Sequence, residues 1–184
     1  MVNNQSNPDY WASVGLASLI FGIFSFAVSI IGGYLIINSE ASGSLAMTVA
    51  QSIMGLMSCL ISAFGGLLAV WHYIKTYDLN ITLGTGALIG FLTGAGIIAV
   101  STVFQEVWSL VDPEFTSKMI QSMINNIEAM ELPDQQKQQM IDSMAAQRDT
   151  GILSSLLWGV PIYGILNLIT GMIGVSVFGR KTEI

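Results

Sequence analysis

Charged side chains are scarce in this sequence, since Asp, Glu, Lys and Arg together make up only 10% of its 184 residues. A typical soluble domain carries about 25% charged residues. The few charges are also segregated, because four long windows contain none: 10–39, 41–74, 79–105 and 150–179. This scarcity, together with 52% hydrophobic residues, excludes an ordinary soluble globular domain.

Cysteine and histidine are also nearly absent, with one residue of each, Cys59 and His72. A single cysteine excludes an internal disulfide, and one histidine offers no partners for a metal site or a catalytic triad. The acidic residues do not match the ligand spacing of a calcium-binding loop. A formal net charge of −6 has the wrong sign for binding the phosphates of nucleic acid. We therefore predict no catalytic residue, metal site, cofactor or nucleic-acid partner.

The uncharged windows are long enough to cross a membrane as helices. A membrane-spanning helix needs roughly 20 mostly apolar residues, and continuous apolarity is unlike the alternating strands of a membrane barrel. Because backbone groups in lipid must be paired within the segment, helices are the remaining solution. We predict an all-α membrane protein in which residues 1–184 form a single integral membrane domain surrounded by the lipid bilayer. Its four transmembrane helices are expected at about 12–37, 47–72, 82–111 and 151–178.

The basic residues predict the orientation of these helices. Four spans place both termini and the 73–81 segment on one side of the membrane. Lys75, Arg180 and Lys181 lie in short segments on that side, and short basic segments favour the cytoplasm. We therefore expect both termini to be cytoplasmic. We expect the first span to be retained, because its apolar run is longer than that of a cleaved signal peptide and no Lys or Arg precedes it.

Small residues at helical spacing predict how the spans pack. In the third span, Gly86, Gly90 and Gly94 recur every four residues, so they share one helix face. Small residues at this spacing let two helices approach closely in lipid. A phosphate-binding glycine loop is disfavoured, because it requires a preceding strand and a following Lys with Ser or Thr. The face could meet another span or another protein. The first span carries a similar row: Ser25, Ser29 and Gly33.

Two residues near or within the spans are candidates for a transport path. Glu106 lies close to the end of the third span, and an ionisable group inside a membrane is a candidate for moving protons or ions. The alternative is an interfacial carboxylate, because Trp108 and Asp112 indicate that water is near. Pro161 interrupts the fourth span, and a proline removes a helical hydrogen bond and tends to kink the helix. Such a kink acts as a gating hinge or is simply accommodated by packing.

The polar segment 112–149 between the third and fourth spans predicts an extramembrane amphipathic helical hairpin. In "DPEFTSKMIQSMINNIEAM", Asp112 suits the N-cap and Pro113 the first helical position. Met and Ile then follow a helical spacing that forms one apolar stripe. "LPD" at 132–134 ends this helix, and a second helix follows. The apolar surface that a partner would contact consists of Met119, Met123, Ile127, Met130, Met140 and Met144.

Three surfaces could cover this apolar stripe: the membrane, the rest of the chain or a partner protein. The membrane surface is disfavoured, because the segment 112–149 has seven acidic and three basic residues, whereas interfacial helices are usually rich in Lys and Arg. The hairpin could instead pack on its own chain and cap the bundle. It could also dock a partner protein, since methionine is flexible and common at adaptable binding surfaces.

The order of these features resembles a known family. Four spans, a Gly-rich third span ending in "VDPEF", a Met-rich acidic hairpin and a Gly-rich last span ending in "FGRK" are similar to an uncharacterised bacterial inner-membrane family, domain-of-unknown-function family 4199. The resemblance covers nearly the whole chain and is most specific over 112–148. It implies a four-span fold and a location in the bacterial cytoplasmic membrane. No short catalytic motif defines this family, so it transfers no functional residue.

These observations favour a non-catalytic multi-pass membrane protein. We expect an accessory or assembly subunit that packs against a larger membrane complex through its Gly-rich helix faces and its Met-rich acidic hairpin. Its partners would be other membrane-protein subunits or further copies of itself. The alternative is a small oligomeric transporter or channel that uses Glu106 and a kink at Pro161. An enzyme is not expected, because the clustered polar groups that intramembrane chemistry requires are missing.

Overall fold

The structure, a computed structural model, describes residues 8–39, 45–148 and 152–179. These residues form six helices and contain no strand, which confirms the predicted all-α fold class. The helices are α1 (Trp11–Ile37), α2 (Leu45–Tyr77), α3 (Leu83–Val111), α4 (Phe115–Glu128), α5 (Asp134–Arg148) and α6 (Ile152–Phe178).

Four helices are long and apolar enough to cross a membrane: Trp11–Ile37, Gly55–Tyr77, Leu83–Val111 and Leu156–Phe178. Each overlaps one of the four predicted spans. The second and fourth stretches begin later than predicted, at Gly55 and Leu156, and α2 continues past the predicted end at residue 72. The helix continues because Tyr73 and Ile74 are buried in the bundle. Lys75 then lies in the last turn of α2, where a cation interacts favourably with the helix dipole.

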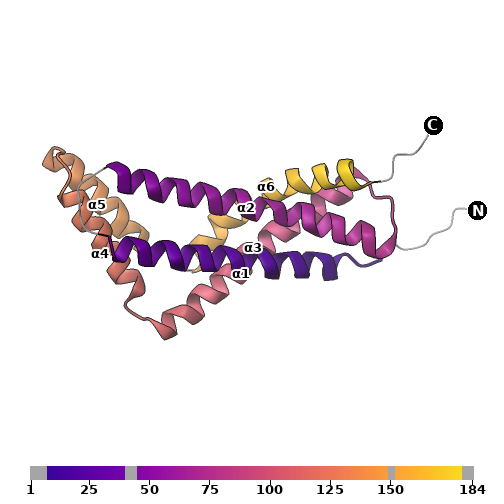
Figure 1. Cartoon of the computed structure of the whole chain (residues 1–184), viewed down its shortest axis with the longest axis horizontal. Helices are drawn as coiled ribbons and strands as arrows, with labels where there is room; N and C mark the ends of the chain where they lie inside the picture. Colours follow the sequence, from indigo (N-terminus) through magenta and orange to yellow (C-terminus); the bar gives the residue numbers. More distant parts are fainter. Residues whose placement is uncertain (1–7, 40–44, 149–151, 180–184) are drawn as a thin grey trace, which may run out of the picture.

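The four long helices run side by side, with α4 and α5 at one end of the bundle (Figure 1). We call this end the hairpin end. The opposite end, which we call the turn end, contains the first residues of α1 and the turn from α2 to α3 (Figure 1). In that turn Asp78 adopts a positive φ of 51°. The Thr82 side chain then caps α3 by accepting a hydrogen bond from the Thr85 amide at 3.2 Å.

The glycine face of α3 packs against α6, and these two helices share the most extensive interface in the bundle. An added Cβ at Gly90 would collide with the Asn167 carbonyl oxygen, and one at Gly94 with the Tyr163 carbonyl oxygen. Gly171 on α6 approaches the Gly86 carbonyl oxygen in the same way. The helix backbones therefore touch, and this face is occupied within the chain.

Buried polar side chains join α6 to α2 beside this interface. The fully buried Asn167 accepts a hydrogen bond from the Gly66 amide at 2.6 Å and donates one to the Tyr163 carbonyl at 2.9 Å. The Thr170 hydroxyl donates to the Ala63 carbonyl at 2.5 Å. Polar groups in lipid-embedded bundles are satisfied in this way, by bonds across helices.

The hairpin between α3 and α6 begins differently from the sequence-based prediction. Asp112 is the C-cap of α3, and α4 begins at Phe115 after Glu114 at its N-cap. The prediction that Asp112 caps α4 is therefore wrong. The physical reason is that its carboxylate is bound elsewhere, because it accepts a hydrogen bond from the Tyr34 hydroxyl at 2.7 Å.

Candidate functional site

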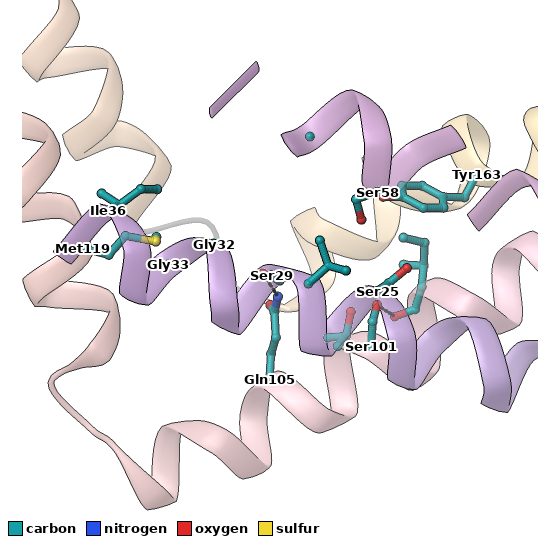
Figure 2. A pocket seen from close by; sticks show the side chains of 14 residues that line it. Ser25, Ser29, Gly32, Gly33, Ile36, Ser58, Ser101, Gln105, Met119 and Tyr163 are labelled. Carbon is teal, nitrogen blue, oxygen red and sulfur yellow. Dashed lines mark hydrogen bonds between the residues drawn. The ribbon is translucent and has the colours of Figure 1, made fainter. Parts of the chain in front are cut away.

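A cavity of about 390 Å³ lies between the four long helices in the half of the bundle that faces the hairpin. Helices α1, α2, α3 and α6 form its walls, and Met119 of α4 contributes to it at the hairpin end. Figure 2 shows the side chains that surround it. None of the described residues that line the cavity is charged. Six of its lining residues carry a hydroxyl group: Ser25, Ser29, Ser58, Ser101, Thr102 and Tyr163.

Helical spacing brings the polar side chains of α1 and α3 to the cavity. Ser25 and Ser29 are four residues apart on α1, and Ser101 and Gln105 are four residues apart on α3. Residues four apart share one face of a helix. The two faces meet where the Gln105 amide nitrogen donates a hydrogen bond to the Ser29 hydroxyl at 3.3 Å (Figure 2).

The hydroxyl groups are partly satisfied by neighbouring helices and by their own backbones. Ser25 and Ser62 share a hydrogen bond of 2.6 Å between α1 and α2, and Ser62 donates to the Ser58 carbonyl at 2.7 Å. Ser101 donates to the Ile98 carbonyl at 3.1 Å. A hydroxyl that donates one bond still has acceptor lone pairs, so the cavity wall retains hydrogen-bonding capacity.

The hairpin is held over this half of the bundle by aromatic contacts with α1. The Phe115 ring lies on the backbone of Gly33, where an added Cβ would collide with it. It also packs edge-on against Tyr34, with ring centroids 5.0 Å apart. Together with the bond from Tyr34 to Asp112, these contacts fix the start of α4. Met119, one turn further along α4, is thereby placed at the cavity.

The predicted small-residue row on α1 serves both packing and the cavity. Ser25, Ser29 and Gly33 all line the cavity. Ser25 also bonds across to α2, and Gly33 gives the close approach to Phe115. By contrast, Gly86 and Gly90 lie in the closely packed interface with α6.

The two predicted transport residues lie away from the cavity lining. Both Glu106 and its neighbour Gln105 are exposed, but only Gln105 lines the cavity, because adjacent residues on a helix point about 100° apart. Pro161 lies inside a continuous α6 with its side chain exposed. Tyr163, two residues later, is the α6 side chain that reaches the cavity.

The Met-rich stripe of the hairpin is turned largely toward its own chain. Ile127 and Met130 are buried, and Met119 and Met123 are half-buried. Helix α4 packs against α1 and α5. On α5, Met140 is half-buried, and the side chain of Met144 lies outside the described residues.

Five residues that line the cavity were not predicted as site residues: Ser58, Ser101, Thr102, Gln105 and Tyr163. The available signal was the set of uncharged polar residues inside apolar spans, including the four-residue spacing of Ser101 and Gln105. Such residues also occur as ordinary packing residues, as Thr93 does by donating to its own Ile89 carbonyl. Only the arrangement of the helices separates the two roles.

No metal-binding cluster occurs in the part of the chain that the structure describes, where no three His, Cys, Asp or Glu side chains come together. His72 instead pairs through its Nδ1 with the Ser13 hydroxyl at 2.8 Å, linking α2 to α1. This contact gives His72 a packing role at the turn end.

The four apolar helices and the polar segment between the last two place this chain among multi-pass helical membrane proteins. Within that class it belongs to the family described as protein of unknown function (DUF4199), whose model matches residues 17–174. The match extends from α1 into α6 and includes the hairpin, which confirms the family resemblance seen in the sequence. No curated protein and no solved structure matches the chain.

Proposed function

We propose that this protein is a non-catalytic multi-pass membrane protein that binds a small uncharged polar molecule in the cavity, as carriers and channels do. The observation that supports this proposal is the group of six hydroxyls and one amide around about 390 Å³ of space inside an apolar bundle. Ligand pockets typically measure about 300–1,000 Å³ and present a few polar groups. Polar side chains within a membrane commonly mark substrate pathways.

The depth of the polar groups supports the same proposal. Ser25 lies near the middle of α1, and Tyr163 lies near the middle of α6. The polar part of the cavity is therefore close to the centre of the bundle, where membrane transporters commonly hold their substrates. Because the lining residues that the structure describes are all uncharged, an ion would lack a counter-charge among them. A neutral ligand fits this lining better.

Ligand-dependent stabilisation tests this proposal. The purified protein in lipid nanodiscs would be heated with a panel of neutral hydroxyl-containing compounds. A ligand that binds only the folded protein stabilises it, by about 2.7 kcal/mol at 100 times its Kd. Gln105→Leu is expected to abolish the increase in Tm, because it removes the amide that bonds Ser29. Glu106→Gln is the matched control on the adjacent, exposed position. The proposal fails if no compound stabilises the wild type, or if Gln105→Leu retains the full increase.

A role as an accessory or assembly subunit is the second candidate. The glycine face packs within the chain, and the described part of the Met-rich stripe is buried or half-buried. A surface that the chain leaves uncovered is therefore a better candidate for this role. The first half of α2 offers one, because every described residue from 52 to 57 is exposed. Consecutive residues point to all sides of a helix, so no neighbouring helix covers this segment. Another membrane protein, or a second copy of this chain, would pack there.

Site-specific photocrosslinking in native membranes tests the second candidate. A photoreactive residue at Leu56 is expected to give a defined protein–protein band. The matched control is Leu88 on α3, which is also exposed but lies in the half of the bundle with the buried glycine face. If both positions label only lipid, the accessory role through α2 is rejected.

We further propose that the protein resides in the bacterial cytoplasmic membrane with both termini in the cytoplasm. Lys75 at the turn end supports this orientation through the positive-inside rule. In a variant with Cys59 replaced by alanine, a cysteine at Gln135 on α5 should react with a membrane-impermeant maleimide in intact cells. A cysteine at Asn80 in the α2–α3 turn should not. The reverse pattern would invert the orientation.

A further inference from the structure

The cavity has a polar end and an apolar end. Ser25, Ser58 and Tyr163 lie at its inner end, near the middle of the bundle, whereas Ile36 and Met119 lie at the hairpin end (Figure 2). The apolar Ile98, one turn before Ser101 on α3, also lines the inner part. Ser25 and Ile36 are eleven residues apart on α1, which corresponds to roughly 16 Å along a helix at 1.5 Å per residue. Ser29 and Gln105 lie between the two ends (Figure 2).

From this gradient we infer that the ligand is a neutral amphiphile that binds with its polar head at the inner end and its apolar tail against Ile36 and Met119. This inference rests on the proposed function, since it names the class of molecule that the same cavity takes. The headgroup would carry hydroxyl or similar uncharged groups, because serine and tyrosine hydroxyls both donate and accept hydrogen bonds.

Ligands of a single polarity fit the cavity less well. A fully polar solute would leave some of its polar groups against Ile36 and Met119 without hydrogen-bond partners, which is costly in an apolar environment. A fully apolar molecule would cover the hydroxyls of Ser25 and Ser58 and block any further bonds to them. An amphiphile avoids both penalties only when its head points inward.

The orientation distinguishes this ligand from ordinary bilayer lipid. A lipid in the leaflet on the hairpin side keeps its headgroup at the membrane surface, which is the end where α4 lies, and its tail near the bilayer centre. The inferred ligand lies the opposite way round. A measured orientation therefore separates a bound ligand from lipid that merely surrounds the protein.

Met119 is the side chain that sets the length of the apolar tail. It lines the apolar end of the cavity, and methionine is a flexible side chain that fills irregular apolar spaces. The backbone behind it cannot recede, because Phe115 is already packed on Gly33. Shortening Met119 should therefore lengthen the space for the tail without altering the polar end.

The test uses alkylglycerols of increasing chain length, each carrying a photoreactive diazirine either beside the glycerol or at the end of the alkyl chain. Each probe is incorporated in nanodiscs with the whole protein, and the labelled residues are identified by mass spectrometry. The headgroup probe is expected to label the segments around Ser58 and Tyr163. The tail probe is expected to label Met119 and Ile36. Met119→Ala should shift the preferred alkyl length upward, whereas Met123→Ala, a half-buried position outside the cavity lining, should not.

The outcomes separate the inference from the proposed function. If the headgroup probe labels α4 and the tail probe labels the inner end, the inferred orientation is wrong while cavity binding stands. If free glycerol competes for the cavity as effectively as alkylglycerol does, the inference that the ligand is an amphiphile is wrong. The proposed function still stands in that case. If neither probe labels the cavity and no neutral compound stabilises the protein, both fail. Because labelling of the wild type alone decides the orientation, a poorly folded Met119→Ala variant does not obscure the result.

Discussion

The two halves of the bundle use the same four helices in different ways. At the turn end, glycines bring α3 and α6 into backbone contact, and the buried Asn167 joins α6 to α2. At the hairpin end, the same helices stand apart around a cavity lined by uncharged polar side chains. The half at the turn end is built for close packing. The half at the hairpin end, which we call the open half, keeps space inside an apolar protein.

Helix α3 shows how sequence produces this difference. Its first half presents Gly86, Gly90 and Gly94 to α6, and its second half presents Ser101 and Gln105 to the cavity. Without a hydrophobic force between helices in lipid, close packing depends on small residues that allow van der Waals contact. Beyond Gly94, this face of α3 carries Ile98, Ser101 and Gln105, which line the cavity and do not bring the α3 and α6 backbones into contact. The cavity therefore begins where the glycine spacing ends.

The largest expected effect comes from inserting the same bulky side chain into each half. Gly90→Leu places a side chain where even a Cβ would meet the Asn167 carbonyl. Overpacking of a close-packed core typically costs about 1–3 kcal/mol, occasionally more. The variant is therefore expected to unfold at a clearly lower temperature or denaturant concentration in nanodiscs. Helical content followed by circular dichroism measures this.

Gly55→Leu is the matched control in the open half. An added Cβ at Gly55 meets no atom within 4 Å, and leucine has a higher helix propensity than glycine. This variant should retain or slightly increase the stability of the fold. If both leucines destabilise the protein equally, the two halves are packed alike and the comparison is wrong.

A smaller effect is expected from removing one side-chain amide from each half. Asn167→Leu removes the acceptor of the Gly66 amide and the donor to the Tyr163 carbonyl. A buried polar group left without its partner costs about 1–3 kcal/mol. Gln105→Leu removes an exposed side chain whose bond to Ser29 is long, at 3.3 Å. Unfolding measured side by side should show a large loss for Asn167→Leu and little change for Gln105→Leu, and the opposite ranking would contradict the comparison.

Much of the architecture was predictable, because long segments without charged residues indicate where the chain crosses the membrane. A span must be apolar over its whole length, so the charge-free windows located α1, α3 and α6 closely. The glycine spacing also predicted a packing face, although only the structure identifies α6 as its partner. Helix ends were less predictable, because burial of Tyr73 and Ile74 extends α2 beyond the predicted end at residue 72.

The cavity was not predictable, because it depends on which faces of four separate helices meet. Ser58, Gln105 and Tyr163 lie far apart in the sequence, and none has an unusual local pattern. Asp112 shows a related limit. Its local sequence is typical of an N-cap, but a tertiary contact from Tyr34 binds the carboxylate instead. Ionisable residues attracted attention in the sequence, whereas the cavity is lined by neutral ones.

A modest effect is expected when the contact between the hairpin and the open half is weakened. Tyr34→Phe removes the 2.7 Å hydrogen bond to Asp112 and retains the ring that packs on Phe115. The net contribution of such a bond is about 0.5–1.5 kcal/mol. Faster hydrogen exchange is expected in the amides of α4, with little change in α3 around Gly90. Equal acceleration in both segments would show that the two halves open together.

Glu114→Gln is the control for this experiment. It breaks the pair between Glu114 and Lys118, whose atoms lie 2.8 Å apart but whose side chains are 72% and 53% exposed. The hydrogen bond to Glu114 raises the pKa of Lys118, so the pair is present at neutral pH and is lost as the pH rises through that elevated pKa. Exposed pairs contribute little to stability, so hydrogen exchange in α4 should remain unchanged.

The smallest effect is expected at Glu106, and it tests which surface of the open half matters. Glu106 is exposed and lies next to Gln105, which lines the cavity. If binding takes place inside the cavity, Glu106→Gln leaves ligand-dependent stabilisation unchanged, because it alters only a charge that points about 100° away. Thermal unfolding with and without the neutral ligand measures this, with Gln105→Leu as the positive control. Loss of binding in Glu106→Gln would instead place the functional surface on the outer face of α3. An ionisable group, and not the neutral cavity lining, would then be the defining feature of the open half.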